Sequence, residues 1–374
     1  MSKQLEVAIA AGGTAGHINP ALALAEELSH RGHHVTFYGQ SQKLEGTLVP
    51  QAGYAFDEIS VTGFDRARPW TLVTALWKMR AARRRLADKF AKSGAPSVAV
   101  GFGAYVEMPL LDWCRRNDVP YAIHEQNSVP GLANKTCARN ATSVCVSFPS
   151  ALGAFEDRIG PKTSLVVSGN PVRRSVVQAS RERGRQAFGV GDDETMLLVF
   201  GGSLGARHLN EAIVRMRDAL MARPKLKVVH STGKELYQEV TDALSLPDGS
   251  EGRWQVLPYI NNMGEALAGA DLVVSRAGAS SIAEIAALAV PSILVPYPLA
   301  TADHQTTNAR YLVDANAARL VPDDQLDGDA LEAVVTELVD DAKVRGAMRQ
   351  AALGLGQDQA ASLLANQVED IARV

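Results

Sequence analysis

Two glycine-rich segments, about half a chain apart, constrain this fold more than any other feature of the sequence. GGTAGH begins at Gly12 and GGSLGA begins at Gly201; each follows a short apolar run and precedes a helical pattern. A glycine turn between a strand and a helix lets backbone N–H groups approach an anion at the positive end of the helix dipole. Because the arrangement occurs twice, the sequence predicts two similar α/β domains in tandem.

The rest of the chain fits this prediction, because short β-rich runs alternate with helical patterns almost from end to end, as in parallel βαβ units. The predicted strands read LEVAIA, HHVTFYG, FDEIS, SVAVG, VPYAIH, TSVCVS and TSLVVSG, then TMLLVF, LKVVHST, WQVLPY, DLVVS, PSILVPY and AARLV. The first helix, PALALAEELSHRG, is expected to begin at Pro20 and to end before Gly32.

We predict an α/β fold of two doubly wound domains. The pattern restarts after GNPVRRS, so the domains are placed at residues 1–168 and 169–356, and a final helix at about 357–374 closes the chain. The length of 374 residues, with 46% hydrophobic and 21% charged residues, supplies material for two cores.

Composition also excludes several classes of protein. The net charge of −3 gives no general attraction to nucleic acid. The three cysteines, Cys114, Cys137 and Cys145, have no paired spacing and fit a reducing compartment. The N-terminus lacks the long apolar region of a secretory signal. The longest near-apolar run, 285–300, is shorter than a membrane span and is broken by three prolines.

A third glycine-rich segment, GFGAYVEMP at 101–109, also follows a predicted strand. Three such loops favour a phosphate-bearing ligand between the two domains. They do not match the known nucleotide motifs, because GxGxxG and GxxxxGK[ST] are both absent. The second strand ends in Tyr38-Gly39-Gln40, where an NAD site would have an acidic residue. These observations argue against NAD and against an ATP-hydrolysing P-loop.

One loop supports a rival interpretation. Residues 201–205 satisfy GxSxG, the nucleophile elbow of α/β-hydrolases, in the required strand–turn–helix context. Ser203 would then be the nucleophile, with His230 or His304 as base and Asp271 or Asp303 as its partner. Against this, GGTAGH has the same context without a serine, and a single hydrolase domain does not account for two similar halves.

More specific segments occur in a fixed order: GGTAGHINPALALA, GFGAYVEMP, HEQNSVPGLANK, SGNPVR, FGGSLGARHLN, LPYINNM, SRAGASSIAEIAAL and DHQTTNA. Together they resemble the MurG family, bacterial glycosyltransferases that move N-acetylglucosamine from a UDP-sugar onto lipid-linked muramyl pentapeptide in peptidoglycan synthesis. The resemblance runs from about residue 6 to the C-terminal helix. It implies the GT-B fold, with two Rossmann-like domains, a deep cleft between them, the acceptor on the first domain and the donor mainly on the second.

The resemblance also implies roles for individual residues. The donor, UDP-N-acetylglucosamine, is expected to meet Ser203 and Arg173 with its phosphates, Tyr259 and Ile260 with its uracil, and Glu284 with its ribose. Gln305, Asn127 and the Thr14-Ala15-Gly16 turn are expected at the sugar. The complete set of expected donor-binding residues is Thr14, Ala15, Gly16, Asn127, Arg173, Ser203, Tyr259, Ile260, Arg276, Ala279, Ser280, Ser281, Ile282, Ala283, Glu284 and Gln305.

The implied reaction is an inverting displacement, in which the muramyl 4-hydroxyl attacks the anomeric carbon and UDP leaves. It requires a base, and His17 is the first candidate because the ordinary pKa of histidine suits neutral pH. Glu125 is the second candidate. Helix N-termini and Arg173 can stabilise the diphosphate, so no cofactor and no metal is expected.

Plainer interpretations stay open for several of these residues. Arg276 fits a structural ion pair as well as a phosphate contact, and Glu284 fits a first-turn carboxylate favoured by the helix dipole. Asn127 is also a turn former before Pro-Gly, and Tyr259 is also a core residue. Beside the transferase and the hydrolase, a non-catalytic sugar-nucleotide-binding protein remains a third interpretation.

The segment between Gly63 and Lys92 is the most basic part of the chain. It holds nine Lys/Arg and two Asp, a net +7 in a chain of net −3, interleaved with apolar residues. A basic amphipathic helix with tryptophans is typical of binding to anionic lipid, and a solvated helix is the alternative. With a polyprenyl-diphosphate acceptor, the first is favoured and predicts a peripheral protein on the cytoplasmic face of the bacterial membrane. The residues expected at the membrane are Trp70, Trp77, Arg80, Arg83 and Arg84.

Overall fold

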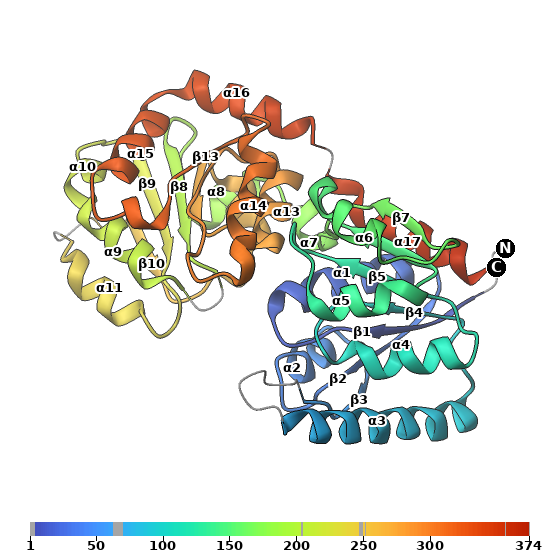
Figure 1. Cartoon of the computed structure of the whole chain (residues 1–374). Helices are drawn as coiled ribbons and strands as arrows, with labels where there is room; N and C mark the ends of the chain where they lie inside the picture. The colour runs from blue at the N-terminus through green and yellow to red at the C-terminus, as the bar shows by residue number, and fades with distance from the viewer. Residues whose placement is uncertain are drawn as a thin grey trace. The chain divides into compact units, whose positions relative to one another are not determined.

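The computed structural model describes residues 4–62, 70–202, 205–246, 250, 252–355 and 357–373. The chain forms two compact units, one comprising Met1–Arg173 with Gln359–Val374 and the other Arg174–Asp358. Each unit is built around its own parallel sheet (Figure 1). The prediction of two tandem doubly wound α/β domains is confirmed.

In the first unit, the described residues form a seven-stranded sheet in the order β3-β2-β1-β4-β5-β6-β7. Every neighbouring pair is parallel. The strands are β1 (Glu6–Ala10), β2 (His34–Gly39), β3 (Ala55–Glu58), β4 (Val98–Gly101), β5 (Tyr121–Glu125), β6 (Ser143–Val146) and β7 (Ser164–Val167).

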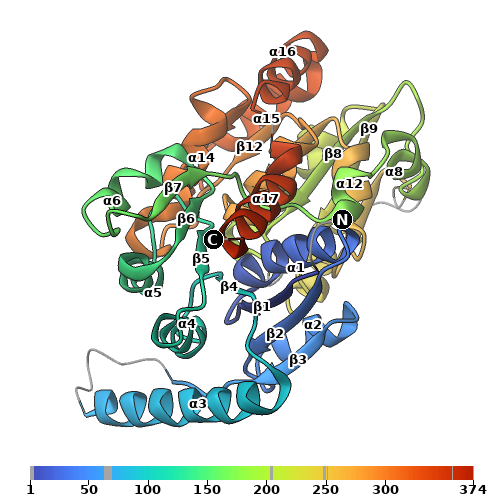
Figure 2. The ribbon, with the colours of Figure 1, turned by 90° about the vertical axis from the view of Figure 1, so that its right-hand side faces the viewer.

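Helices cover both faces of this sheet (Figure 2). They are α1 (Ala15–His30), α2 (Glu45–Gln51), α3 (Thr71–Ser93), α4 (Glu107–Arg116), α5 (Leu132–Cys137), α6 (Gly153–Glu156) and, after the second unit, α17 (Ala360–Ala372), with short 3₁₀ turns η1 (Ala138–Asn140) and η2 (Pro149–Ala151). Alternate residues of β1 face opposite cores: Val7 and Ile9 pack with α1 and α17, and Ala8 and Ala10 pack with α3 and α4. Burial on both faces accounts for the continuous apolar runs in the sequence.

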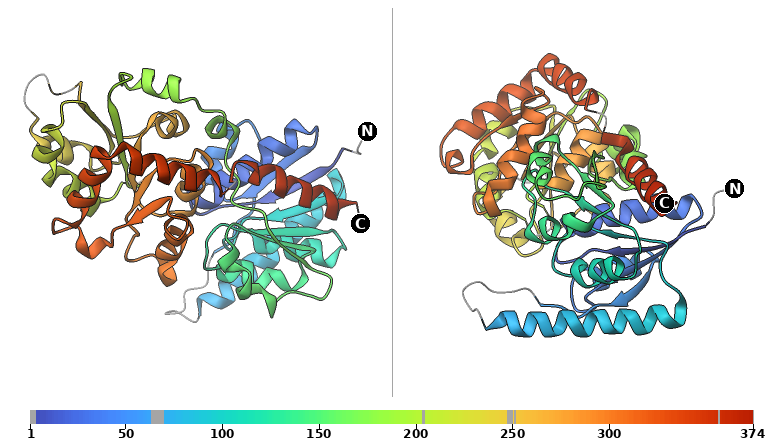
Figure 3. Two further views of the ribbon diagram at one scale, coloured as in Figure 1. Left: turned by 90° about the horizontal axis from the view of Figure 1, so that it is seen from above. Right: turned by 45° about the vertical axis from the view of Figure 1, so that its right-hand side comes forward.

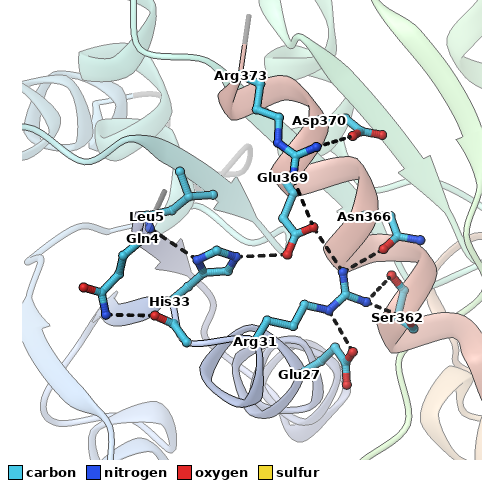
Figure 4. A network of polar contacts seen from close by, with 11 residues as sticks. Gln4, Leu5, Glu27, Arg31, His33, Ser362, Asn366, Glu369, Asp370 and Arg373 are labelled. Atoms are coloured by element: carbon cyan, nitrogen blue, oxygen red, sulfur yellow. Dashed lines mark hydrogen bonds and ion pairs between the residues drawn. The ribbon is translucent and has the colours of Figure 1, made fainter. Parts of the chain in front are cut away.

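The C-terminal helix α17 lies against α1 (Figure 3). Its Leu364 and Val368 are fully buried in the core of the first unit. Polar contacts between the two helices add to this packing (Figure 4). Arg31 donates to the Ser362 hydroxyl (2.7 Å) and pairs with Glu369 (3.3 Å), which also contacts His33. The last residues of the chain are therefore part of the fold of the first unit.

In the second unit, the described residues form a six-stranded parallel sheet in the order β10-β9-β8-β11-β12-β13. Its strands are β8 (Thr195–Phe200), β9 (Leu226–Ser231), β10 (Trp254–Leu257), β11 (Leu272–Ser275), β12 (Ser292–Leu294) and β13 (Ala318–Leu320). Its helices are α7 (Arg174–Val177), α8 (Arg181–Ala187), α9 (Arg207–Arg215), α10 (Arg217–Met221), α11 (Tyr237–Leu244), α12 (Met263–Gly269), α13 (Ala279–Ala287), α14 (His304–Val313), α15 (Ala330–Asp340) and α16 (Ala342–Leu353), with 3₁₀ turns η3 (Thr301–Asp303), η4 (Asp323–Gln325) and η5 (Gln357–Gln359), the last of which leads into α17.

The strand orders place the glycine loops at special positions. In the first sheet, β2 and β3 follow on one side of β1, and β4 to β7 follow on the other side. In the second sheet, β9 and β10 follow on one side of β8, and β11 to β13 follow on the other. The strand order therefore reverses between β1 and β4 and between β8 and β11. Open parallel sheets bind ligands outside the carboxyl ends of their strands at such switch points. GGTAGH follows β1, GFGAYVEMP follows β4, and GGSLGA follows β8. All three predicted loops thus lie where this architecture binds ligands.

The start of the first helix differs from the prediction. We expected α1 to begin at Pro20, but it begins at Ala15, with Thr14 as its N-cap. Proline lacks the N–H that would bond four residues back, so a start at proline was the simplest interpretation. The structure instead tolerates Pro20 within α1, and the helix N-terminus lies in the glycine loop. Gly32 follows the end of the helix with φ +88°, as predicted.

Candidate active site

In the first unit, the loops that follow β1 and β4 meet at His17. The His17 Nδ1 lies 3.0 Å from the Thr14 hydroxyl oxygen, which fixes the orientation of the imidazole ring. The ring packs on Gly103, where a Cβ would lie 3.3 Å from His17 Cδ2. Gly103 has φ +83° and the next residue, Ala104, has φ +64°, so this loop is held in the left-handed region. Two of the three glycine loops therefore combine around one histidine.

Ala15 and Gly16 lie in the first turn of α1, between Thr14 and His17. The loop in front of them is held by a buried carboxylate that the sequence did not indicate. Glu45 accepts from the N–H groups of Gly13 and Gln40, both at 3.1 Å, and is fully buried. It thereby ties the glycine loop after β1 to the end of β2.

Glu125 ends β5 beside this region and is 2% exposed. Its carboxylate accepts from the N–H groups of Asn127 and Gly131, both at 3.0 Å, and from the Asn134 amide at 2.8 Å. Burial raises the pKa of Glu125, and these hydrogen bonds oppose that rise. The geometry organises the loop from 126 to 131, including Asn127, around a buried carboxylate.

A third buried acidic side chain lies below the Gly103 loop. Glu107, in the first turn of α4, is fully buried and accepts from the Gly103 N–H at 2.6 Å. Burial raises the pKa of Glu107 to about 8, the Gly103 hydrogen bond opposes this, and the nearby charge of Glu125 adds to it. Its Oε1 has no hydrogen-bond partner among the described residues. Glu107 therefore supports the loop on which His17 packs.

In the second unit, Ser203 and Leu204 lie outside the described residues, and the other four residues of the GGSLGA loop are described. Gly205 has φ +79°, and a Cβ there would lie 2.1 Å from the Thr232 carbonyl oxygen, so only glycine fits. Asn210 of α9 donates to the same carbonyl at 3.0 Å. The N-terminus of α9 is thus packed against the end of β9.

The N-terminus of α13 lies after β11, on the other side of the switch point. Gly278 is its N-cap, and residues 279–283 form its first turn and the start of the second. The buried Ser280 hydroxyl has no hydrogen-bond partner among the described residues. Glu284 is the sixth residue of the helix, so the interpretation of Glu284 as a first-turn carboxylate is wrong. The error arose because the helix begins at Ala279 rather than near Glu284.

Three further predicted donor-binding residues follow β10 and β12 of the second sheet. Tyr259 and Ile260 follow β10; the tyrosine is 47% exposed, which excludes a plain core role, and the isoleucine is buried. The Gln305 Oε1 accepts from the N–H groups of Ala277 (3.2 Å) and Tyr297 (2.9 Å). Its side-chain carbonyl is therefore fixed in the protein, and its NH₂ group, which has no hydrogen-bond partner among the described residues, is able to donate.

The two predicted phosphate-binding arginines have partners in the structure. Arg173 pairs with Glu26 of α1 at 2.9 Å. Arg276 is buried; its guanidinium pairs with Asp323, donates to the carbonyls of Val295 (3.3 Å) and Pro296 (3.1 Å), and stacks on the Tyr297 ring. The ion pair expected as one alternative for Arg276 is present, and a donor contact of either arginine stays a prediction.

His230, one of the two bases considered for the hydrolase interpretation, has no aspartate partner among the described residues. His230 is fully buried and its Nε2 lies 3.0 Å from Asn210 Oδ1, while burial lowers its pKa to about 3. Asp271 instead pairs with Arg181 and Arg185. The pair of His230 with Asp271 that the hydrolase interpretation requires is therefore not formed. The other candidate base, His304, has its Nδ1 2.9 Å from the Thr301 carbonyl oxygen.

Residues 63–69 of the basic segment lie outside the described residues; from Trp70, the N-cap of α3, onward the segment forms α3, whose two faces differ sharply. Leu86 and Phe90 pack in the core, while Trp70 and Trp77 on the opposite face are 69% and 71% exposed. A hollow of about 350 Å³ on the exposed face is lined by Trp77, Arg80, Ala81, Arg84, Arg85 and Asp88. No helix among the described residues is long and apolar enough to span a membrane.

Arg83 does not belong to the exposed face with the other predicted membrane residues. It lies on the flank of α3 that faces α4 and pairs there with Asp112 at 2.8 Å. Asp112 also pairs with Arg115 and Arg116. Trp70, Trp77, Arg80 and Arg84 remain as the exposed members of the predicted set.

Comparison with known proteins matches both halves of the chain to one family. Residues 7–146 match the glycosyltransferase family 28 N-terminal domain, and residues 196–368 match its C-terminal domain. The chain is 37% identical, over 99% of its length and all of the relative, to the UDP-N-acetylglucosamine–N-acetylmuramyl-(pentapeptide) pyrophosphoryl-undecaprenol N-acetylglucosamine transferase of Halothermothrix orenii. The enzyme of the same name from Leuconostoc mesenteroides is 39% identical over 94% of this chain and 95% of the relative. The crystal structure of Acinetobacter baumannii MurG is similar, with a TM-score of 0.74 and 28% identity over 97% of this chain and 99% of that one.

Proposed function

Because the chain belongs to glycosyltransferase family 28 and to its N-acetylmuramyl-(pentapeptide) pyrophosphoryl-undecaprenol N-acetylglucosamine transferases, we propose that it transfers N-acetylglucosamine from UDP to the lipid-linked muramyl pentapeptide of peptidoglycan synthesis. One observation in the structure carries this proposal. The two strands at the switch point of the second sheet, β8 and β11, are each followed by a glycine turn and a helix N-terminus. Such a pair is suited to a diphosphate.

The donor, UDP-N-acetylglucosamine, binds to the carboxyl edge of the second sheet. Its diphosphate meets the N-termini of α9 and α13, with Ser203 and the Ser280 hydroxyl as donors and Arg173 and Arg276 as cations. Uracil packs on Tyr259 and is read by the Ile260 backbone, and Glu284 accepts from the ribose hydroxyls. Gln305, Asn127 and the turn from Thr14 to Gly16 contact the sugar. The exposed ring of Tyr259 and the fixed carbonyl of Gln305 support these assignments.

In the reaction, the muramyl 4-hydroxyl attacks the anomeric carbon, the bond from that carbon to the UDP oxygen breaks, and the hydroxyl proton passes to His17. UDP leaves with the electron pair, and the anomeric configuration inverts. His17 is suited to the role of base because Thr14 and Gly103 fix its ring. Glu125, with its acceptor positions engaged by three donors, holds the neighbouring loop in place.

The developing charge on UDP requires stabilisation in the transition state. Two helix N-termini aimed at one diphosphate supply oriented N–H groups at no reorganisation cost. We assign the stabilisation to these helices and to the arginines, without a metal ion or other cofactor.

The acceptor is anchored in a membrane, so the enzyme works at the bilayer surface. The exposed face of α3, which carries Trp70, Trp77, Arg80 and Arg84, binds anionic lipid on the cytoplasmic side and makes the protein peripheral. Tryptophans suit the lipid interface, and arginines suit anionic head groups. The separation of this face from the buried face of α3 supports the assignment.

Replacing Trp70 and Trp77 by alanine and Arg80 and Arg84 by glutamine is expected to abolish sedimentation with phosphatidylglycerol vesicles. Each arginine near such a surface contributes about 1 kcal/mol, so the loss is at least tenfold in partitioning. UDP binding stays unchanged in the same protein. A matched variant with Arg115 and Arg116 replaced, which pair with Asp112, is expected to keep most of its vesicle binding. Sedimentation equal to wild type in the first variant would show that α3 is only a solvated helix.

A nucleotide panel tests the proposed function directly. Thermal unfolding of the full chain is followed with UDP, UDP-N-acetylglucosamine, ADP and NAD, and transfer to a lipid-linked muramyl pentapeptide is assayed in parallel. We expect stabilisation by the two uridine nucleotides alone, and transfer in the assay. Binding without transfer would favour the non-catalytic alternative, and the absence of any response to UDP would refute the donor assignment.

A further inference from the structure

One carboxylate joins the two segments that flank the switch point of the second sheet. Asp323, at the start of η4, has its Oδ2 2.8 Å from His208 Nδ1, and its Oδ1 accepts from the guanidinium of Arg276. His208 and Asp323 are separated by 115 residues in sequence. The contact is therefore a feature of the tertiary structure and not of a local turn.

Both partners of Asp323 lie directly beside the helix N-termini assigned to the diphosphate. His208 is the second residue of α9, immediately after the GGSLGA loop. Arg276 directly follows β11 and precedes Gly278, the N-cap of α13. Asp323 thus connects α9 to the turn that begins α13, although η4 itself follows β13.

This connection is largely shielded from water. The side chains of Asp323 and Arg276 are 12% and 9% exposed. Burial acts to raise the pKa of Asp323, and the hydrogen bonds from His208 and Arg276 outweigh it and hold that pKa below its ordinary value. Arg276 also donates to the carbonyls of Val295 and Pro296, so the loop after β12 joins the same network. A shielded, charge-assisted network is rigid, which is what a preorganised anion site requires.

We infer that Asp323 is a positioning residue of the donor site: through His208 and Arg276 it sets the spacing of the α9 and α13 N-termini to fit one diphosphate. The inference rests on the proposed function, because it concerns the same UDP-binding loops. Asp323 touches neither donor nor acceptor, and it acts through its two partners.

Histidine as one of the two partners gives the connection a pH dependence. His208 faces Asp323 on η4 and Asp327 on the following loop. The Asp327 Oδ1 lies 3.1 Å from the His208 Nε2. Arg215 of α9 pairs with Asp327, and Arg276 pairs with Asp323. With a carboxylate at each ring nitrogen, the imidazolium form is stabilised, and the hydrogen bond that His208 donates to Asp323 raises the pKa of His208. UDP affinity should therefore weaken as pH rises through that pKa.

The test measures the dissociation constant of UDP by calorimetry, from pH 6 to 9, on the full chain and on Asp323→Asn, His208→Gln and Asp324→Asn. Asp324 is the exposed neighbour of Asp323 and gives the same charge change on η4. We expect at least a tenfold weaker Kd in Asp323→Asn, a smaller loss in His208→Gln, and a Kd within twofold of wild type in Asp324→Asn. At saturating donor, kcat of Asp323→Asn falls by less than threefold. The pH dependence of the Kd disappears in both Asp323→Asn and His208→Gln.

The outcomes separate this inference from the proposed function. A wild-type chain that fails to bind UDP refutes the donor assignment and the inference with it. If the wild type binds UDP, and Asp323→Asn and His208→Gln bind it with the same Kd and the same pH dependence as the wild type, the inference alone is refuted. Should Asp323→Asn not fold, His208→Gln decides the question, because the pH dependence of the Kd either vanishes or persists.

Discussion

Replacing His17 by alanine is expected to lower kcat by about 10²–10⁴, the usual contribution of a positioned general base. The ring of His17 is fixed by Thr14 and packs on Gly103 at the switch point of the first sheet. A base must be neutral to accept the proton, so wild-type activity should be lost in acid. The measurement is steady-state transfer with both substrates saturating, between pH 5 and 9.

UDP affinity is the internal control for this variant, because the donor loops belong to the second unit. We expect the Kd of UDP in His17→Ala to lie within twofold of wild type. His34 is a matched surface control, since it lies at the start of β2, away from the carboxyl edge of the sheet, and His34→Ala should keep full activity. A normal kcat with a raised acceptor KM in His17→Ala would instead assign His17 to acceptor positioning.

The fold was predictable because its signals are local. A parallel sheet covered on both faces requires continuous apolar strands, and the turns at its switch points require glycine at positions such as Gly103 and Gly205. Both requirements are visible within a few residues of sequence. The start of α1 was missed because the local rule for proline competes with a helix N-terminus that only the loop packing reveals.

The candidate site was predictable only where its residues belong to short sequence motifs, whether these form loops or the first turns of helices. His17, Tyr259 and Gln305 lie in the segments that the sequence singled out. Glu45 and Glu107 were missed, because a glutamate in the first turn of a helix is typical of an exposed position. Their burial depends on strands and loops that fold over them, and the Asp323 contact joins segments far apart in the chain. Pairings at such distances leave no pattern in a single sequence.

Glu107 leads to the second large expected effect, a pH dependence of stability. Burial raises its pKa from the ordinary 4.5 to about 8. Between these values the folded state holds a proton that the unfolded state has released, so stability decreases as pH rises. From pH 5 to 8 this group alone lowers the free energy of unfolding by an amount on the order of 4 kcal/mol.

Glu107→Gln removes this titration and keeps a side-chain oxygen that can accept from the Gly103 N–H. We expect the variant to match wild type at pH 5 and to be the more stable protein at pH 8, by most of that difference. Urea unfolding of the full chain at pH 5, 6.5 and 8 gives the comparison. A stability difference between the two proteins that stays constant from pH 5 to 8 would show that Glu107 is already ionised in the folded state at pH 5.

Asp112, on the same helix α4, provides the control of opposite sign. Burial acts to raise its pKa, but hydrogen bonds from Arg83, Arg115 and Arg116 outweigh it and lower that pKa to about 2. A depressed pKa contributes stability that is fully present above the unfolded value of 3.8 and is lost only in acid. Asp112→Asn should therefore be less stable than wild type by the same amount at pH 5, 6.5 and 8. Only a buried, protonated carboxyl such as Glu107 produces a difference that grows across this range.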